Sequence, residues 1–138
     1  MKDAWPLMSA SIRVAKATDA PALAQVLVDR WLLTHRGQIP EGQWQKRHDE
    51  WTYPVSERGW RRALAQIEAG RDSQTCVFVA VTPADEVVGV AAGRPARRDF
   101  LDHAAALSAI YIRPAYQGLG LGRRLVQAVA LHQASLGR

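Results

Sequence analysis

The fold of this chain depends on one stretch, LSAIYIRPAYQGLGLGRRL, which runs from Leu107 to Leu125. It predicts a strand, a turn and a helix, in that order. The run Ile110-Tyr111-Ile112 is β-branched and aromatic, which favours a strand, and Pro114 lacks the N–H that further strand pairing needs. Beyond the turn, residues recur at the spacing of one helix face, namely Leu121, Leu125, Ala128, Val129 and His132.

Three glycines, Gly118, Gly120 and Gly122, alternate through the predicted turn. Glycines let the backbone turn tightly and let a ligand come close. The first N–H groups of the following helix have no partner within the helix and lie at its positive end, so this corner suits a phosphate. A P-loop is excluded because Arg123 and Arg124 stand where it needs lysine and serine or threonine. A dinucleotide-binding turn is excluded because the spacing is G-x-G-x-G instead of G-x-G-x-x-G.

The same stretch resembles the pyrophosphate motif of the GNAT superfamily of acetyl-CoA-dependent N-acetyltransferases, Gln/Arg-x-x-Gly-x-Gly/Ala. Gln117, Gly120 and Gly122 meet this motif, behind an apolar strand that ends in proline. The resemblance implies acetyl-CoA as co-substrate, with its pantetheine amides on the strand backbone and its pyrophosphate on the turn and helix start. The coenzyme-binding residues that it implies are Ile110, Ile112, Gln117, Gly118, Gly120, Gly122 and Arg123.

The rest of the chain predicts the elements that such a fold needs. Alternation indicates a strand over residues 11–15, and a helix is expected from Thr18-Asp19-Ala20-Pro21 to about His35, stopped by Gly37. A second helix is expected from a Ser56 cap to Gly70, followed by a hairpin of two strands over residues 75–81 and 87–92. Residues 37–54 are the least regular part, and two readings stay open for them: a wall of the acceptor site, or a cover for the sheet edge.

The predicted fold class is therefore α/β (α+β), a GNAT-like, mixed and mostly antiparallel sheet with helices on both faces. The expected order is β-α-α-β-β-β-α in a single domain over residues 1–138, with residues 1–10 as a loose leader. The family continues with further strands and a helix, so the chain is expected to be shortened at its C-terminus. That shortening leaves the edge of the last strand open, and open edges invite pairing with another chain. A homodimer covering this edge is the expectation.

Composition and charge limit the partners and the cellular location that this chain can have. The formal net charge is +5, but the basic residues are scattered in pairs such as Arg61-Arg62 and Arg97-Arg98. This pattern favours a solvated surface over nucleic-acid binding. No apolar run approaches a membrane span of about 18 residues, the start lacks a signal peptide's apolar core, and Cys76 is the single cysteine. A cytoplasmic protein without membrane attachment is expected. The four histidines show no metal-ligand spacing, so no metal site is predicted.

The resemblance implies acetyl transfer from acetyl-CoA to a primary amine of unknown identity. The alternative is a catalytically inactive, shortened relative that binds acyl-CoA or a partner. The catalytic residues are unknown. Strand N–H groups near Ile110 and Ile112 are suited to polarising the thioester carbonyl, but no residue qualifies as the general base. The candidates weighed for that role, each read more readily as a solvated loop residue, are Glu41, Asp99, Asp102 and His103.

Overall fold

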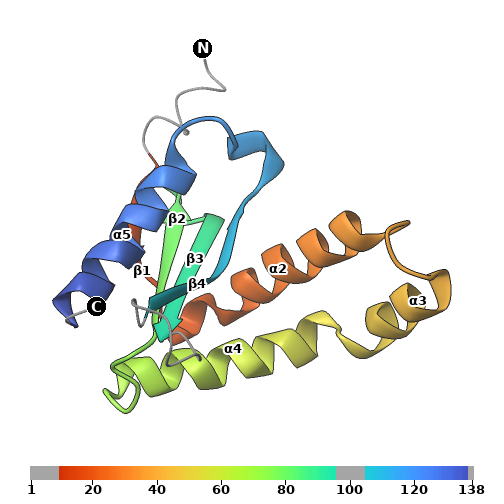
Figure 1. Ribbon diagram of the computed structural model, residues 1–138, viewed down its shortest axis with the longest axis horizontal. Helices are drawn as coiled ribbons and strands as arrows, with labels where there is room; N and C mark the ends of the chain where they lie inside the picture. The colour runs from red at the N-terminus through yellow and green to blue at the C-terminus, as the bar shows by residue number, and fades with distance from the viewer. Residues whose placement is uncertain (1–9, 96–104, 137–138) are drawn as a thin grey trace.

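A computed structural model describes residues 10–95 and 105–136 of the chain. Its elements are β1 (Ser11–Val14), η1 (Ala17–Asp19), α2 (Ala20–His35), α3 (Glu41–Glu50), α4 (Tyr53–Glu68), β2 (Cys76–Val81), β3 (Val87–Pro95), β4 (Ala105–Ile112), η2 (Pro114–Tyr116) and α5 (Leu121–Ser135). The four strands form one antiparallel sheet in the order β1-β2-β3-β4. Figure 1 shows α2 and α4 side by side below the sheet and α5 on its other face. The α/β fold with helices on both sheet faces, predicted from the sequence, is confirmed.

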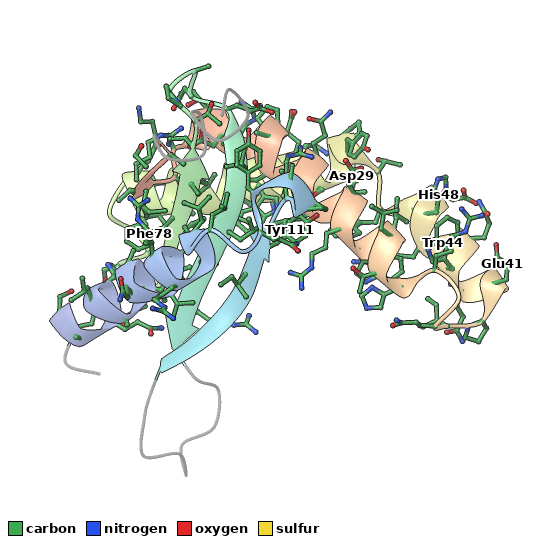
Figure 2. The ribbon with its side chains drawn as sticks, turned by 90° about the horizontal axis from the view of Figure 1, so that it is seen from above. Asp29, Glu41, Trp44, His48, Phe78 and Tyr111 are labelled. Atoms are coloured by element: carbon green, nitrogen blue, oxygen red, sulfur yellow. The ribbon has the colours of Figure 1, made fainter. Side chains whose placement is uncertain are left out.

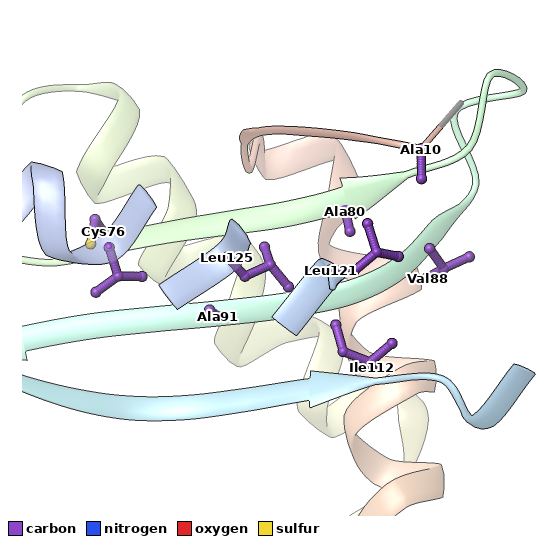
Figure 3. Close-up of a cluster of buried hydrophobic side chains, with 9 residues drawn as sticks. Ala10, Cys76, Ala80, Val88, Ala91, Ile112, Leu121 and Leu125 are labelled. Atoms are coloured by element: carbon purple, nitrogen blue, oxygen red, sulfur yellow. The ribbon is translucent and has the colours of Figure 1, made fainter. Parts of the chain in front are cut away.

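Alternation along the strands divides the core into two layers, because successive side chains of a strand point to opposite faces. Beneath α5, Ala80 and Ala91 of the sheet form one buried cluster with Leu125. Figure 3 shows this layer, in which Ile112 of β4 also takes part. On the opposite face Leu23 of α2 and Leu64 of α4 form one cluster with five valines of β2 and β3, namely Val77, Val79, Val81, Val87 and Val90. The sheet is therefore held rigidly from both sides, which fixes the end of β4 relative to α2 and α5.

Glycine at position 93 lets α5 lie close to β3. A Cβ placed there would be 2.5 Å from Val129 Cγ1 and 2.9 Å from Gln133 Nε2, both too short for real contacts. The β-bulge between Ala92 and Gly93 lies at the same point of the strand pair. The small residue thus sets the distance at which α5, and with it the preceding turn, sits against the sheet.

Three sequence predictions about the elements are corrected. The segment 37–54 is not irregular, because α3 forms within it. The helix α4 starts at Tyr53 with Thr52 as its N-cap, whereas Ser56 lies inside the helix and is buried. Pro54 in the first turn explains this earlier start, since proline is preorganised for that position. The strand β3 continues past Ala92 to Pro95.

Other predictions concern residues outside the described ranges. These are most of the loose leader (residues 1–9), the greater part of the connection before β4, and the candidate residues Asp99, Asp102 and His103. Ala10, the one leader residue that the structure describes, is buried against the α5 layer.

An ion pair fixes the start of α2. The Arg13 guanidinium donates to the two Asp19 carboxylate oxygens at 2.7 and 2.9 Å, and the Lys16 N–H donates to Asp19 at 2.7 Å. The helix begins where the sequence predicts, but Asp19 serves this cluster and does not cap α2 with its side chain. The hydrogen bond from Arg13 is the main reason why the pKa of Asp19 lies below its ordinary value of 3.8.

We therefore expect acid to weaken the protein through Asp19. A lowered pKa in the folded state adds stability above the ordinary pKa of 3.8, and this stability is lost as the pH falls through the lowered value. At pH 7 the Asp19→Asn variant should be less stable by about 1–3 kcal/mol, and the difference should shrink below pH 4. Urea unfolding at pH 7 and pH 3 measures both effects. Glu50→Gln, which changes an exposed carboxylate, is the control. An Asp19→Asn variant as stable as the parent at pH 7 would contradict the assignment.

Candidate functional site

The open edge of β4 exposes backbone amides at two of the predicted coenzyme residues. The Arg113 N–H donates to the Val88 carbonyl oxygen at 2.9 Å, so this pair is hydrogen-bonded across β3 and β4. Bonded and non-bonded pairs alternate along an antiparallel ladder. The N–H and C=O groups of Ile110 and Ile112 consequently point away from β3, and within residues 10–95 and 105–136 no strand pairs with that side of β4.

Two side chains contact this open edge, and their hydrogen bonds agree with the outward orientation of the Ile110 and Ile112 backbone groups. Arg30 of α2 donates to the Ile110 carbonyl oxygen, and its guanidinium carbon lies 4.9 Å from the centre of the Tyr111 ring. Gln117 donates from Nε2 to the Ile112 carbonyl oxygen at 2.8 Å. Both outward carbonyls are therefore occupied by side-chain donors, and the adjacent N–H groups are the ones left to receive an acceptor from a ligand.

The turn after η2 has the backbone that a phosphate cradle needs. Gly118 and Gly120 have φ values of +78° and +83°, which glycine adopts without strain. A Cβ at either position would have no atom within 4 Å, so the space beside this backbone is open. The Arg124 N–H bonds to the Gly120 carbonyl oxygen at 3.1 Å as the first bond of α5. The N–H groups of Leu121, Gly122 and Arg123 precede it and have no intrahelical acceptor.

The two arginines after the glycines have different surroundings. Arg124 donates from a guanidinium nitrogen to the Ala10 carbonyl oxygen at 3.0 Å and so holds the chain just before β1. Arg123 is exposed in the first turn of α5. Arg123 stays a predicted coenzyme-binding residue, whereas Arg124 links α5 to the chain before β1.

This difference predicts opposite effects for the two substitutions. Arg123→Ala should weaken coenzyme A binding a few-fold, on the order of 0.2–1 kcal/mol, and more at low salt than at high salt. Arg124→Ala should lower the melting temperature and leave the coenzyme affinity close to that of the parent. Calorimetric titration at two salt concentrations, together with thermal unfolding, measures both. The reverse pattern would show that Arg124, not Arg123, faces the phosphates.

A pocket of about 390 Å³ lies between α2, α3 and the end of β4. Its size is within the range of about 300–1,000 Å³ that is usual for small-molecule sites. In Figure 2, Asp29 lies on α2 between Tyr111 and the α3 residues Trp44 and His48. Pro114, which begins η2, also lines the pocket, so the pocket and the glycine turn lie on either side of that short element.

Trp44 is fixed as a rigid wall of this pocket. Its indole N–H donates to the Leu32 carbonyl oxygen at 3.0 Å, and the side chain is buried. The His48 ring stacks on it with centroids 5.2 Å apart, and the Arg36 guanidinium carbon lies 4.7 Å from the centre of the indole ring. Of the two readings for residues 37–54, Trp44 and His48 therefore fit a pocket wall.

The Asp29 carboxylate in the pocket already has one hydrogen-bond donor from the protein. Asp29 accepts a hydrogen bond from the Tyr53 hydroxyl, and this bond is the main reason why the pKa of Tyr53 is raised. A raised pKa makes Tyr53 a weaker acid than ordinary tyrosine. Asp29 lines the pocket and can meet a cationic ligand.

The remaining sequence candidates lie elsewhere. Glu41 is exposed in the first turn of α3 and does not line the pocket. His35 stacks on Trp31 at 4.8 Å and contacts the Trp31 carbonyl oxygen at 3.0 Å, as expected for a residue at a helix end. Within the described ranges, no group of three or more His, Cys, Asp or Glu side chains is placed to hold a metal ion.

Sequence reasoning missed several pocket residues. Arg113 of the pocket and Arg30 beside the β4 edge carried no motif. The pocket stripe of α2 was overlooked beside the core stripe of the same helix. That stripe has the spacing of one helix face and consists of Asp29, Leu32, Leu33 and Arg36. The sequence signal for this stripe was a charged residue, Asp29 or Arg36, at each end of the apolar pair Leu32 and Leu33.

A strand with outward amides, a glycine turn at a helix start and a pocket thus meet at one end of β4. The family model described as acetyltransferase (GNAT) family matches residues 41–135, and the chain belongs to this family. A search of curated proteins finds no match to this sequence. No helix in the part of the chain that the structure describes is long and apolar enough to span a membrane.

Solved structures of acetyltransferases share the fold. PaiA N-acetyltransferase from Thermoplasma acidophilum, in complex with coenzyme A, gives a TM-score of 0.69 at 17% identity, over 94% of this chain and 75% of that one. An aminoglycoside acetyltransferase from an uncultured soil metagenomic sample, in complex with sisomicin, gives 0.56 at 15% identity, over 94% and 73%. Glucosamine-6-phosphate N-acetyltransferase from Arabidopsis thaliana gives 0.58 at 13% identity, over 93% and 76%. The TM-scores show a common fold, and at these low identities the likeness shows the fold alone.

Proposed function

We propose that this protein transfers an acetyl group from acetyl-CoA to a primary amine. The observation that carries the proposal is the meeting of three features at one end of β4: two outward amides, an open glycine turn at the start of α5, and the pocket. Membership of the acetyltransferase (GNAT) family supports the reaction class.

Acetyl-CoA fits the edge and the turn in a definite order. Its pantetheine amides are placed along Ile110 and Ile112, where they extend the sheet as a short strand would. Its diphosphate is placed on the N–H groups around Gly118, Gly120 and Gly122, at the positive end of the α5 dipole. Gln117 shapes this turn from behind, by holding the Ile112 carbonyl, and Arg123 adds positive charge at its rim.

The reaction joins the two sites. The ammonium group of the acceptor loses a proton, and the neutral nitrogen attacks the thioester carbonyl carbon. A C–N bond forms, the nitrogen gives up a second proton, and the C–S bond breaks. Of the two protons that the nitrogen loses, one protonates the leaving thiolate and the other passes to water. The products are the acetylated amine and coenzyme A. An outward N–H of β4 stabilises the carbonyl oxygen as negative charge develops there.

Two measurements test this function together. Coenzyme A should raise the melting temperature, because a ligand that binds only the folded state stabilises it by mass action. Release of the coenzyme thiol should depend on an amine when acetyl-CoA is supplied with a broad amine panel. A thermal shift without amine-dependent thiol release would instead favour a non-catalytic binding protein, and no thermal shift at all would remove the coenzyme site.

The open edge of β4 also supports a proposal about assembly. Residues 105–109 of β4 lie outside the span assigned to pantetheine, and an exposed strand edge is a template for pairing. We propose a homodimer in which a second copy covers this part of the edge. Analytical ultracentrifugation tests the dimer, and a monomer at high concentration would contradict it.

A cytoplasmic location is also proposed, because the single cysteine, Cys76, is buried and suits a reducing compartment.

A further inference from the structure

The charges of the α2–α3 pocket are unequal. Arg36 and Arg113 bring two guanidinium groups to its wall, and Asp29 brings one carboxylate, which the Tyr53 hydroxyl already contacts. Among the described residues, neither arginine has a carboxylate within ion-pair distance. The lining therefore has an excess of positive charge, although amine acceptors are themselves cations before they react.

Arg113 in particular lacks a protein partner for a buried donor. Its Nε is buried and has no hydrogen-bond acceptor within the described ranges. Buried donors are nearly always satisfied, because an unmet one costs about 1–3 kcal/mol. Arg113 directly follows β4 and shares the α2 face of the sheet with Tyr111, since alternate residues of a strand share a face. Its guanidinium lies near enough to the Tyr53 hydroxyl to act on it electrostatically.

Arg36 holds the opposite side of the same pocket. It follows the last residue of α2, is exposed at the rim, and rests on the Trp44 ring. This cation–π contact holds the guanidinium charge of Arg36 at the rim of the pocket. The apolar surface between the two arginines comes from Leu32, Leu33 and Trp44.

We infer that the acceptor is a primary amine that also carries an anionic group, either a carboxylate or a phosphate. This inference rests on the proposed acetyl transfer. The anionic group binds Arg113, with Arg36 closing the rim, since guanidinium groups bind both anions through paired N–H donors. The ammonium group faces the Asp29 carboxylate, which draws it to the end of β4 where the thioester lies. The apolar wall accepts the carbon skeleton between the two charges.

Matched acceptor pairs test this inference. L-amino acids are compared with their amides, and phosphoethanolamine with ethanolamine, so that each pair differs in the anionic group; the two series separate carboxylate from phosphate. For the preferred series, the parent protein should show a KM at least about tenfold lower for the anionic member, as expected for a charge-assisted contact. Equal use of both members in both series overturns the inference.

Variants locate the effect. Arg113→Met should raise the KM for the anionic amine about tenfold or more, while the KM for its neutral partner and for acetyl-CoA stays near that of the parent. Arg58→Met, an exposed change on α4, is the matched control and should alter nothing. If Arg113→Met does not fold, Arg36→Met at the rim should show the same selectivity in smaller degree. Equal KM changes for both members of a pair overturn the inference.

A binding measurement separates this inference from the proposed function. Calorimetric titration of the same compounds into protein loaded with coenzyme A needs no turnover. Arg113-dependent binding of an anionic amine, without any acetyl transfer, supports the inference and removes the proposed function. Acetyl transfer to neutral amines alone supports the proposed function and overturns the inference. If no anionic amine of either series binds or reacts, the inference is overturned.

Discussion

Gly120→Glu is expected to weaken coenzyme binding about 100-fold while the protein stays folded. The new carboxylate would lie in the open space beside the turn, where the diphosphate is placed, and would repel it. Losing two charge-assisted hydrogen bonds of about 1.5 kcal/mol each lowers the affinity on the order of 100-fold. The α5 helix itself tolerates the change, because a negative charge near a helix N-terminus is favourable. Calorimetric titration with coenzyme A measures the loss.

Gly70→Glu is the matched control for this variant. Gly70 follows α4 with a φ value of +74°, close to the +83° of Gly120, and a Cβ there also has open space around it. Both substitutions therefore bear the same strain of a left-handed residue, about 1–2 kcal/mol, and the same added charge. Gly70→Glu should bind coenzyme A like the parent. An equal loss of affinity in both variants would mean that the effect comes from general destabilisation.

Ile110→Pro is expected to lower acetyl transfer about 100-fold, the usual cost of removing one donor to a developing oxyanion. Proline removes the outward N–H of Ile110, and edge strands tolerate proline where the N–H faces away from the partner strand. The hydrogen bonds to β3 should survive because Tyr111 and Arg113 make them. Steady-state kinetics with saturating acetyl-CoA, compared with thermal unfolding, measure the change.

Two companion variants interpret that result. Ile110→Ala removes most of the same side chain, which packs against the α5 layer, but keeps the amide; its turnover should stay within a few-fold of the parent. Tyr111→Pro removes an inward N–H and should instead unfold the sheet edge. If Ile110→Ala were as slow as Ile110→Pro, the side chain and not the amide would be responsible.

Local signals were sufficient for most of the fold. Proline and glycine punctuation marked the start of α2 and the turn before α5. Alternation marked β1, and a β-prone run with the turn after it marked β2 and β3. These features depend on a few neighbouring residues, so one sequence reveals them. The helix α3 was missed because it is polar on nearly every side and buries only Trp44. A helix without an apolar stripe gives no periodic signal.

The candidate site also has a part that a local motif predicts and a part that only the tertiary fold reveals. The residues Ile110, Ile112, Gln117, Gly118, Gly120, Gly122 and Arg123 were proposed from the motif, and their coenzyme role stays a prediction. Which amides of β4 face outward follows from its pairing with β3, which no local pattern encodes. The pocket brings Asp29 and Arg113 together from positions far apart in the chain, so only the tertiary fold reveals their charges as one set.

A crystal structure of the protein with acetyl-CoA tests the central claim most directly. We predict hydrogen bonds from the diphosphate to backbone N–H groups between Gly118 and Arg123, and from the pantetheine arm to Ile110 and Ile112. The acetyl group should then open onto the pocket beside Tyr111. A coenzyme bound elsewhere, with this turn empty and the β4 edge paired to protein along its whole length, would contradict the account.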